Sequence, residues 1–82
     1  MTRVTIYSRP DCHLCEEMKA IVEIVRRDTP FELEEIDIST DTTLEARYGV
    51  EIPVLEINGK KAAKYRVGED DLRRILVGRS GA

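Results

Sequence analysis

The segment Ser8-Arg9-Pro10-Asp11-Cys12-His13-Leu14-Cys15 decides the fold, because it holds both cysteines of the chain. It follows residues 3–7, which are rich in β-branched and aromatic side chains typical of a strand, and it leads into apolar residues with helical spacing. Cysteines three apart in the first turn of a helix share one face and lie close enough to bridge. The unpaired N–H groups of that turn stabilise a thiolate. The segment therefore predicts redox chemistry.

Composition limits the classes of function. With 82 residues, the chain is long enough for one small core, and we expect a single domain over residues 1–82. A net charge of -3 gives no basic surface for nucleic acid. There is no signal-peptide pattern and no apolar run that would span a membrane. Two closely spaced cysteines match a reducing compartment, so we expect a cytoplasmic protein.

The first half of the chain predicts alternating strands and helices. A helix is expected over residues 12–28, ended by Pro30, and a strand over residues 31–38 with an irregularity near Glu34-Glu35, where its apolar alternation changes phase. A short helix over residues 42–48 should follow, with Gly49 as a left-handed cap. Because strands separated by helices pair in parallel through right-handed crossovers, the first two strands should be neighbours.

The second half predicts a hairpin and a final helix. Asn58-Gly59 is a strong two-residue turn signal between strands at residues 53–57 and 60–67. The last helix should begin near Glu69, and residues 79–82 should form a frayed tail. The basic residues of the return strand protect a sheet edge against pairing or, as a second interpretation, meet an acidic partner: Lys60, Lys61, Lys64 and Arg66.

With Cys12-His13-Leu14-Cys15 after the first strand, Ile52-Pro53 leading the third and Gly68-Glu69-Asp70-Asp71 before the last helix, the chain resembles the glutaredoxin branch of the thioredoxin-fold family. The resemblance covers nearly the whole chain. It implies an α/β thioredoxin-like fold of order β-α-β-α-β-β-α, with a mixed four-stranded sheet flanked by helices. It also implies a cis peptide bond before Pro53 and thiol-disulfide oxidoreductase activity.

The two cysteines are the expected catalytic residues. Cys12, at the helix start, is expected to be the nucleophile, and Cys15, on the apolar stripe with Met18, to be the buried resolving thiol. The alternatives are a structural or metal-binding Cys12 and a Cys15 that is only a small core residue. A single histidine beside two cysteines does not supply the four ligands of a structural zinc, so no metal site is expected.

Two residues flank the nucleophile. Relatives commonly place a basic residue at the position of Arg9, where it meets a substrate carboxylate and favours the thiolate, although an exposed loop arginine would look the same. His13 either acts on Cys12 as a neighbouring cation or is a solvent-facing polar residue, and the sequence favours neither.

The remaining expected substrate-binding residues come from the resemblance. The residue before the strand-start proline, Ile52, offers its backbone to an extended substrate beside Pro53, which could otherwise be an ordinary edge-strand proline. Asp70 and Asp71 match the acidic pair that meets the amine of glutathione in relatives. Acidic residues in a first helical turn are also explained by the helix dipole alone.

The chain departs from the glutathione-binding pattern. Relatives usually have Thr-Val-Pro where this chain has Glu51-Ile52-Pro53, and a Gly-Gly pair in place of Val67-Gly68. A carboxylate at Glu51 is expected to repel an acidic tripeptide. His13-Leu14 also replaces the Pro-Tyr that dithiol glutaredoxins commonly carry. Glutathione is therefore only a candidate co-substrate.

Three hypotheses follow. The first is a monomeric dithiol oxidoreductase that acts on protein disulfides, holds no tightly bound cofactor and is reduced by glutathione or by thioredoxin reductase. The second is an iron-sulfur cluster-binding protein that bridges two subunits. The third is a redox-inert interaction module that retains the motif. Neither nucleic acid nor a membrane is an expected partner.

Overall fold

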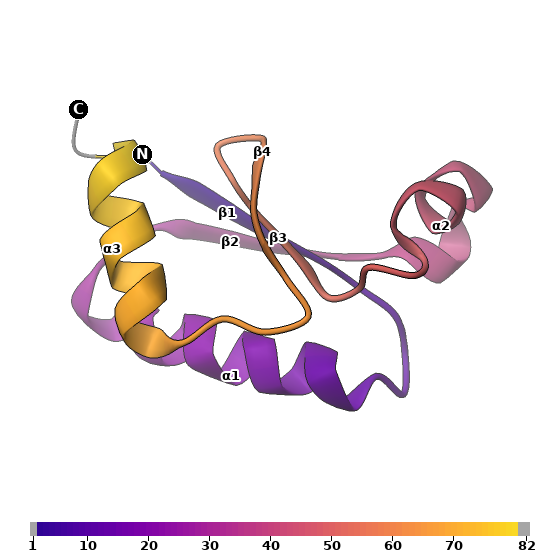
Figure 1. Cartoon of the computed structure of the whole chain (residues 1–82), viewed down its shortest axis with the longest axis horizontal. Coiled ribbons are helices and arrows are strands. Elements are labelled where there is room, and N and C mark those ends of the chain that lie inside the picture. The colour runs from indigo at the N-terminus through magenta and orange to yellow at the C-terminus, as the bar shows by residue number, and fades with distance from the viewer. Residues whose placement is uncertain (1, 81–82) are drawn as a thin grey trace.

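The computed structural model describes residues 2–80 and shows the predicted order of elements (Figure 1). The strands and helices are β1 (Arg3–Ser8), α1 (His13–Asp28), β2 (Glu32–Asp37), the 3-10 turn η1 (Ile38–Thr40), α2 (Thr42–Tyr48), β3 (Val54–Ile57), β4 (Lys60–Lys64) and α3 (Glu69–Ser80). The thioredoxin-like α/β class expected from the sequence is therefore confirmed.

The four strands form one mixed sheet in the order β2-β1-β3-β4. β1 pairs in parallel with β2, from Arg3 opposite Glu32 to Ser8 opposite Asp37, and antiparallel with β3. β3 and β4 form the predicted antiparallel hairpin. The register aligns the C-terminal end of β1, the C-terminal end of β2 and the start of β3 at one end of the sheet, and the cysteine segment leaves β1 at that end.

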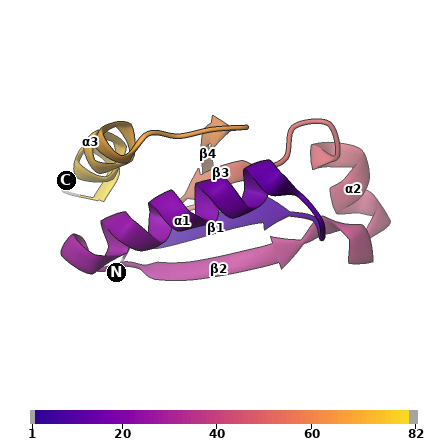
Figure 2. The same cartoon turned by 90° about the horizontal axis from the view of Figure 1, so that it is seen from below.

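The sheet separates two apolar clusters. Helices α1 and α3 cover one face, and Figure 2 shows α1 lying along β1 and β2. The main core on this face contains the following buried residues: Val4, Ile6, Met18, Val22, Val25, Phe31, Leu55, Ile57, Leu72 and Leu76. A smaller cluster of Ile38, Tyr48 and Val54 lies under α2, which sits at the end of the sheet where β1 and β2 finish (Figure 1).

Local signals in the sequence explain several boundaries. The side chain of Asp41 accepts hydrogen bonds from the backbone N–H groups of Thr43 and Leu44, so it caps α2. Asn58 and Gly59 have φ angles of 53° and 85°, as the predicted tight hairpin turn requires.

Four details differ from the predictions. β2 pairs continuously without the expected irregularity, because Phe31 and Ile38 lie outside the strand. β4 ends at Lys64, since the backbone turns at Tyr65 with a φ of 69°. Gly49 is right-handed, and a Cβ there would collide with the carbonyl oxygen of Glu45. α3 continues through Ser80, whereas residues 81–82 of the expected tail lie outside the described residues.

Candidate active site

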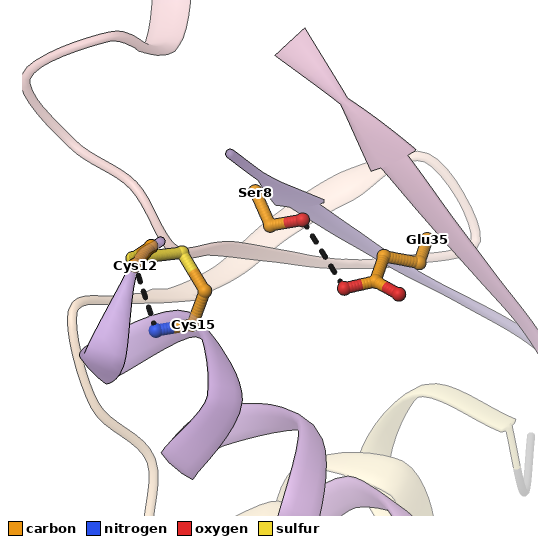
Figure 3. Close-up of a disulfide and its surroundings, with 4 residues drawn as sticks. All are labelled: Ser8, Cys12, Cys15 and Glu35. Carbon is orange, nitrogen blue, oxygen red and sulfur yellow. Dashed lines mark hydrogen bonds between the residues drawn. A yellow bond between two sulfur atoms is a disulfide. The ribbon is translucent and has the colours of Figure 1, made fainter. Parts of the chain in front are cut away.

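The cysteine pair lies at the N-terminus of α1. Cys12 is the N-cap residue, and its sulfur accepts a hydrogen bond from the backbone N–H of Cys15 at 3.1 Å. The two residues form a disulfide, with their Cα atoms 5.2 Å apart (Figure 3). The predicted proximity of the two sulfurs at a helix start is therefore confirmed.

The two cysteines differ in access to solvent. Cys12 is half-buried, whereas Cys15 is only 3% exposed and belongs to the buried face of α1 with Met18 and Val22. The predicted burial of Cys15 is confirmed, and the assignment of Cys12 as the nucleophile stays a prediction. The sulfur of Cys15 belongs to a residue on the buried face of α1.

An open cavity of about 350 Å³ lies between the cysteine segment and the end of β2. It is lined by Ser8, Arg9, Pro10, Asp11, Cys12, Cys15, Glu16, Lys19, Glu35 and Asp37. Both cysteines border this cavity, so a small molecule or several waters can reach the disulfide from the side of β2.

Glu35 is a candidate functional residue that sequence reasoning missed. Its carboxylate accepts a hydrogen bond from the hydroxyl of Ser8 at 3.2 Å and forms an ion pair with Lys19 at 3.0 Å. The bond to Glu35 raises the pKa of Lys19. In Figure 3 the Glu35 carboxylate points toward Ser8, on the side where the disulfide lies. The available signal was a carboxylate two residues after Leu33, on the strand face that should be apolar.

Arg9 borders the cavity, but its guanidinium is paired with a residue of α2. Its guanidinium pairs with Glu45 of α2 at 3.4 Å, and its Nε is buried without a hydrogen-bond partner among the described residues. The charge of Arg9 also helps to lower the pKa of Asp37, although the main cause is the hydrogen bond from Ser39. Arg9 thus links the cysteine loop to α2.

His13 extends away from the protein. Its side chain is 87% exposed, and its Nε2 lies 3.4 Å from a carboxylate oxygen of Glu17, one turn along α1. Of the two interpretations left open by the sequence, this geometry matches the solvent-facing polar residue.

The Ile52-Pro53 bond is cis, as predicted. Since Tyr7 is opposite Val54 in the β1–β3 pairing, this bond lies at the same end of the sheet as the cysteine segment. Pro53 is fully buried, and Ile52 is half-buried against the cluster under α2. Their expected substrate contact stays a prediction.

The carboxylate of Glu51 is neutralised by a neighbouring lysine. Its side chain forms an ion pair with Lys61 of β4, and the hydrogen bond from Lys61 lowers the pKa of Glu51. The repulsion of an acidic substrate, which we expected from Glu51, is therefore reduced by the neighbouring lysine.

Asp70 and Asp71 lie in the first turn of α3, and both are exposed. Asp71 pairs with Arg74 at 3.4 Å and borders a separate hollow formed with Ala63 and Val67. Neither aspartate lines the cavity beside the cysteines. Of these predicted residues, Arg9 therefore lines the same cavity as the two cysteines, whereas Asp70 and Asp71 lie outside it.

Within residues 2–80, no three or more His, Cys, Asp or Glu side chains are grouped to hold a metal ion. In the same part of the chain, no helix is both long enough and apolar enough to cross a membrane.

Comparisons with known proteins agree with this geometry. Residues 3–77 match the model of a family described as "Glutaredoxin-like domain (DUF836)". The crystal structure of protein XcR50 from X. campestris is similar, with a TM-score of 0.80 and 29% identity, over 92% of this chain and 96% of that one. Protein Ne2328 from Nitrosomonas europaea is 32% identical with a TM-score of 0.78, over 90% of this chain and 89% of that one. Chloroplastic thioredoxin z shares the fold, with a TM-score of 0.81 at 13% identity, over 100% of this chain and 80% of that one.

Proposed function

This chain belongs to the glutaredoxin-like domain family, and on that premise we propose that it is a thiol-disulfide oxidoreductase that uses Cys12 and Cys15. One observation carries the proposal: a half-buried cysteine caps a helix and is bonded to a buried cysteine one turn later. The first sulfur has access to a partner and the backbone donors that stabilise a thiolate. The second cysteine is almost fully buried and is bonded to the first.

The reaction proceeds in two exchanges. The thiolate of Cys12 attacks one sulfur of a substrate disulfide, forms a mixed disulfide and expels the other substrate sulfur as a thiolate. Cys15 then loses its proton, attacks the sulfur of Cys12 and expels the remaining substrate thiolate. The substrate gains two electrons, and the Cys12–Cys15 disulfide that the structure contains is the oxidised product.

Protein disulfides are the proposed substrates, and the enzyme is proposed to act as a cytoplasmic monomer without a tightly bound cofactor. Arg9, Ile52 and Pro53 are the proposed docking residues, since they lie at the same end of the sheet as Cys12. Asp70 and Asp71 would serve only a substrate that extends beyond the cavity. Neither nucleic acid nor a membrane takes part in this proposal.

The experiment that tests this function supplies electrons from two sources. The protein is incubated with a disulfide substrate and either glutathione with its reductase or thioredoxin reductase, and NADPH consumption is followed. We expect turnover in one of the two systems and none with Cys12→Ser. The absence of turnover in both systems would contradict the proposed activity, and the system that works identifies the physiological class of reductant.

Iron-sulfur binding remains the second hypothesis from the sequence. A bridged cluster requires the cysteines as thiolates, so it would form only after the Cys12–Cys15 disulfide has been reduced. Anaerobic reconstitution with iron and sulfide, followed by visible absorbance spectroscopy, tests the hypothesis. A brown product with stoichiometric iron would favour it over the dithiol function.

A further inference from the structure

The resolving step requires a proton acceptor for Cys15. A thiol is a poor nucleophile, so Cys15 has to become a thiolate before it attacks the mixed disulfide. Its side chain is only 3% exposed, which restricts direct contact with bulk water. The cavity that it borders provides the route for its proton.

Glu35 occupies an unusual position on this route. It lies opposite Ile6 in the β1–β2 pairing, on the sheet face covered by α1, where Val4 and Ile6 are fully buried. Its own side chain stays 40% exposed through the opening of the cavity, so it can exchange a proton with solvent. A carboxylate at such a position departs from the apolar pattern of that face, and departures of this kind are typical of functional sites.

Two side chains fix the Glu35 carboxylate beside the cysteines. The hydroxyl of Ser8 donates to one oxygen at 3.2 Å, and the ammonium of Lys19 donates to the other at 3.0 Å. Lys19 follows Cys15 by four residues on α1, so both lie on the same side of the helix. Cys15, Ser8, Lys19 and Glu35 all line the same cavity. Figure 3 shows how Ser8, Glu35 and the disulfide lie relative to one another.

The other titratable groups of the cavity are less suited to this role. Asp37 caps the turn η1 by accepting hydrogen bonds from Ser39, so its carboxylate is held by that turn and not by a residue of the helix that carries Cys15. Asp11 and Glu16 are exposed, and among residues 2–80 neither carboxylate accepts hydrogen bonds like those from Ser8 and Lys19 to Glu35. Arg9 and Lys19 are cations, and each is paired with a carboxylate.

We infer that Glu35 accepts the proton of Cys15 during resolution, through water in the cavity; this inference rests on the proposed dithiol function. The S–H bond of Cys15 breaks, and the proton passes to the carboxylate of Glu35. The Cys15 thiolate forms a bond with the Cys12 sulfur, and the bond from Cys12 to the substrate sulfur breaks. The substrate leaves as a thiolate, and Glu35 returns the proton to solvent.

The two exchanges are separated with an aromatic disulfide, 5,5′-dithiobis(2-nitrobenzoate). When it is mixed with one equivalent of reduced protein, attack by Cys12 releases one coloured thiolate, and resolution by Cys15 releases the second. Stopped-flow absorbance gives both rates from about pH 6 to about pH 10, which brackets the ordinary thiol pKa of about 8.5. The proteins are the wild type, Glu35→Gln, Glu35→Asp and Glu34→Gln. Glu34 is an exposed carboxylate next to Glu35 and is the matched control.

We expect Glu35→Gln to slow the second phase by about 100-fold near neutral pH and to leave the first phase unchanged. The deficit should disappear toward the upper end of the pH range, where hydroxide ionises Cys15 directly. Glu35→Asp should retain most of the rate because it keeps the carboxylate, and Glu34→Gln should match the wild type. Circular dichroism spectra that match the wild type show that the variants are folded.

Two results would overturn the inference. One is a second phase that Glu35→Gln leaves unchanged, and the other is a slowing by the same factor at every pH, as expected for a purely structural role. Both leave the proposed dithiol function intact. A wild-type protein that shows no second phase at all would instead contradict the dithiol function itself.

Discussion

The sulfur of Cys12 accepts a hydrogen bond from the backbone N–H of Cys15, with 3.1 Å between the two atoms. A thiolate accepts such a bond more strongly than a thiol, so the helix N-terminus favours ionisation of Cys12. We predict that the pKa of the Cys12 thiol lies below the ordinary value of about 8.5. Alkylation rates of Cys15→Ser across pH measure it, and a profile like that of a free cysteine would contradict the prediction.

The unequal exposure of the two sulfurs predicts which variant traps a substrate. Cys15→Ser should still attack a disulfide and should accumulate a mixed disulfide on Cys12, whereas Cys12→Ser should form almost none. Non-reducing electrophoresis after incubation with a disulfide-containing protein shows the adduct. Equal trapping by both variants would mean that the two sulfurs are equally accessible.

His13 is predicted to contribute little to the reactivity of Cys12. Its side chain is 87% exposed and its partner is Glu17, and such surface pairs are worth at most about 1 kcal/mol. His13→Gln should therefore change the alkylation rate of Cys12 by less than about fivefold. A larger loss that follows the protonation of an imidazole across pH would assign His13 to the site after all.

The buried carboxylate of Glu56 predicts a stability effect at Tyr48. The hydroxyl of Tyr48 donates to Glu56 at 3.0 Å, and that of Tyr7 donates to its other oxygen at 3.3 Å. Removal of one donor leaves a buried oxygen without its partner, so Tyr48→Phe should cost about 1–3 kcal/mol at neutral pH. Urea unfolding measures the change. Tyr65→Phe, at an exposed tyrosine, is the control.

This difference should depend on pH in a defined direction. Burial, and then the bond to Glu56, raise the pKa of Tyr48 from 10.0 to about 12. Above pH 10.0, the tyrosine ionises in the unfolded chain but stays neutral in the folded protein. The wild type therefore loses stability as the pH rises from 10.0 toward about 12. Tyr48→Phe has no such hydroxyl to ionise, so the difference in unfolding free energy between the wild type and Tyr48→Phe should become smaller in this pH range. A constant gap would show that Tyr48 does not titrate in this way.

Helix α3 is predicted to stabilise the fold without affecting the dithiol. Leu72 is fully buried in the main core, and Leu72→Ala should cost about 2–5 kcal/mol. Val77 is 72% exposed on the same helix, and Val77→Ala should change stability by less than about 0.5 kcal/mol. Thermal melts compare the two. Both should leave the alkylation rate of Cys12 unchanged, because no residue of α3 lines the cavity within the described part of the chain.

The sequence predicted secondary structure best at positions where the local backbone geometry requires a particular type of residue. Asn58-Gly59 predicted the hairpin, because both residues adopt the positive φ angles that its tight turn requires. The helical spacing of Met18 and Val22 was enough to assign Cys15 to the buried face of α1.

The cavity could not be predicted in the same way. The alternation of apolar residues around Glu35 indicated a strand but not its limits, so a change of phase looked like an irregularity. The partners of Glu35 are distant in sequence, since Ser8 lies 27 residues away and Lys19 lies 16 residues away. Likewise, nothing local to Arg9 indicated that Glu45 would bind its guanidinium.

The two edges of the sheet carry charges of opposite sign. The outer strand β2 has four carboxylates in its six residues, and the outer strand β4 has three lysines in its five. A two-fold symmetric dimer that extends the sheet must pair one edge with the same edge of the second copy, which would bring like charges face to face. Repulsion between like charges therefore opposes a two-fold symmetric sheet that continues from one copy of this chain to a second.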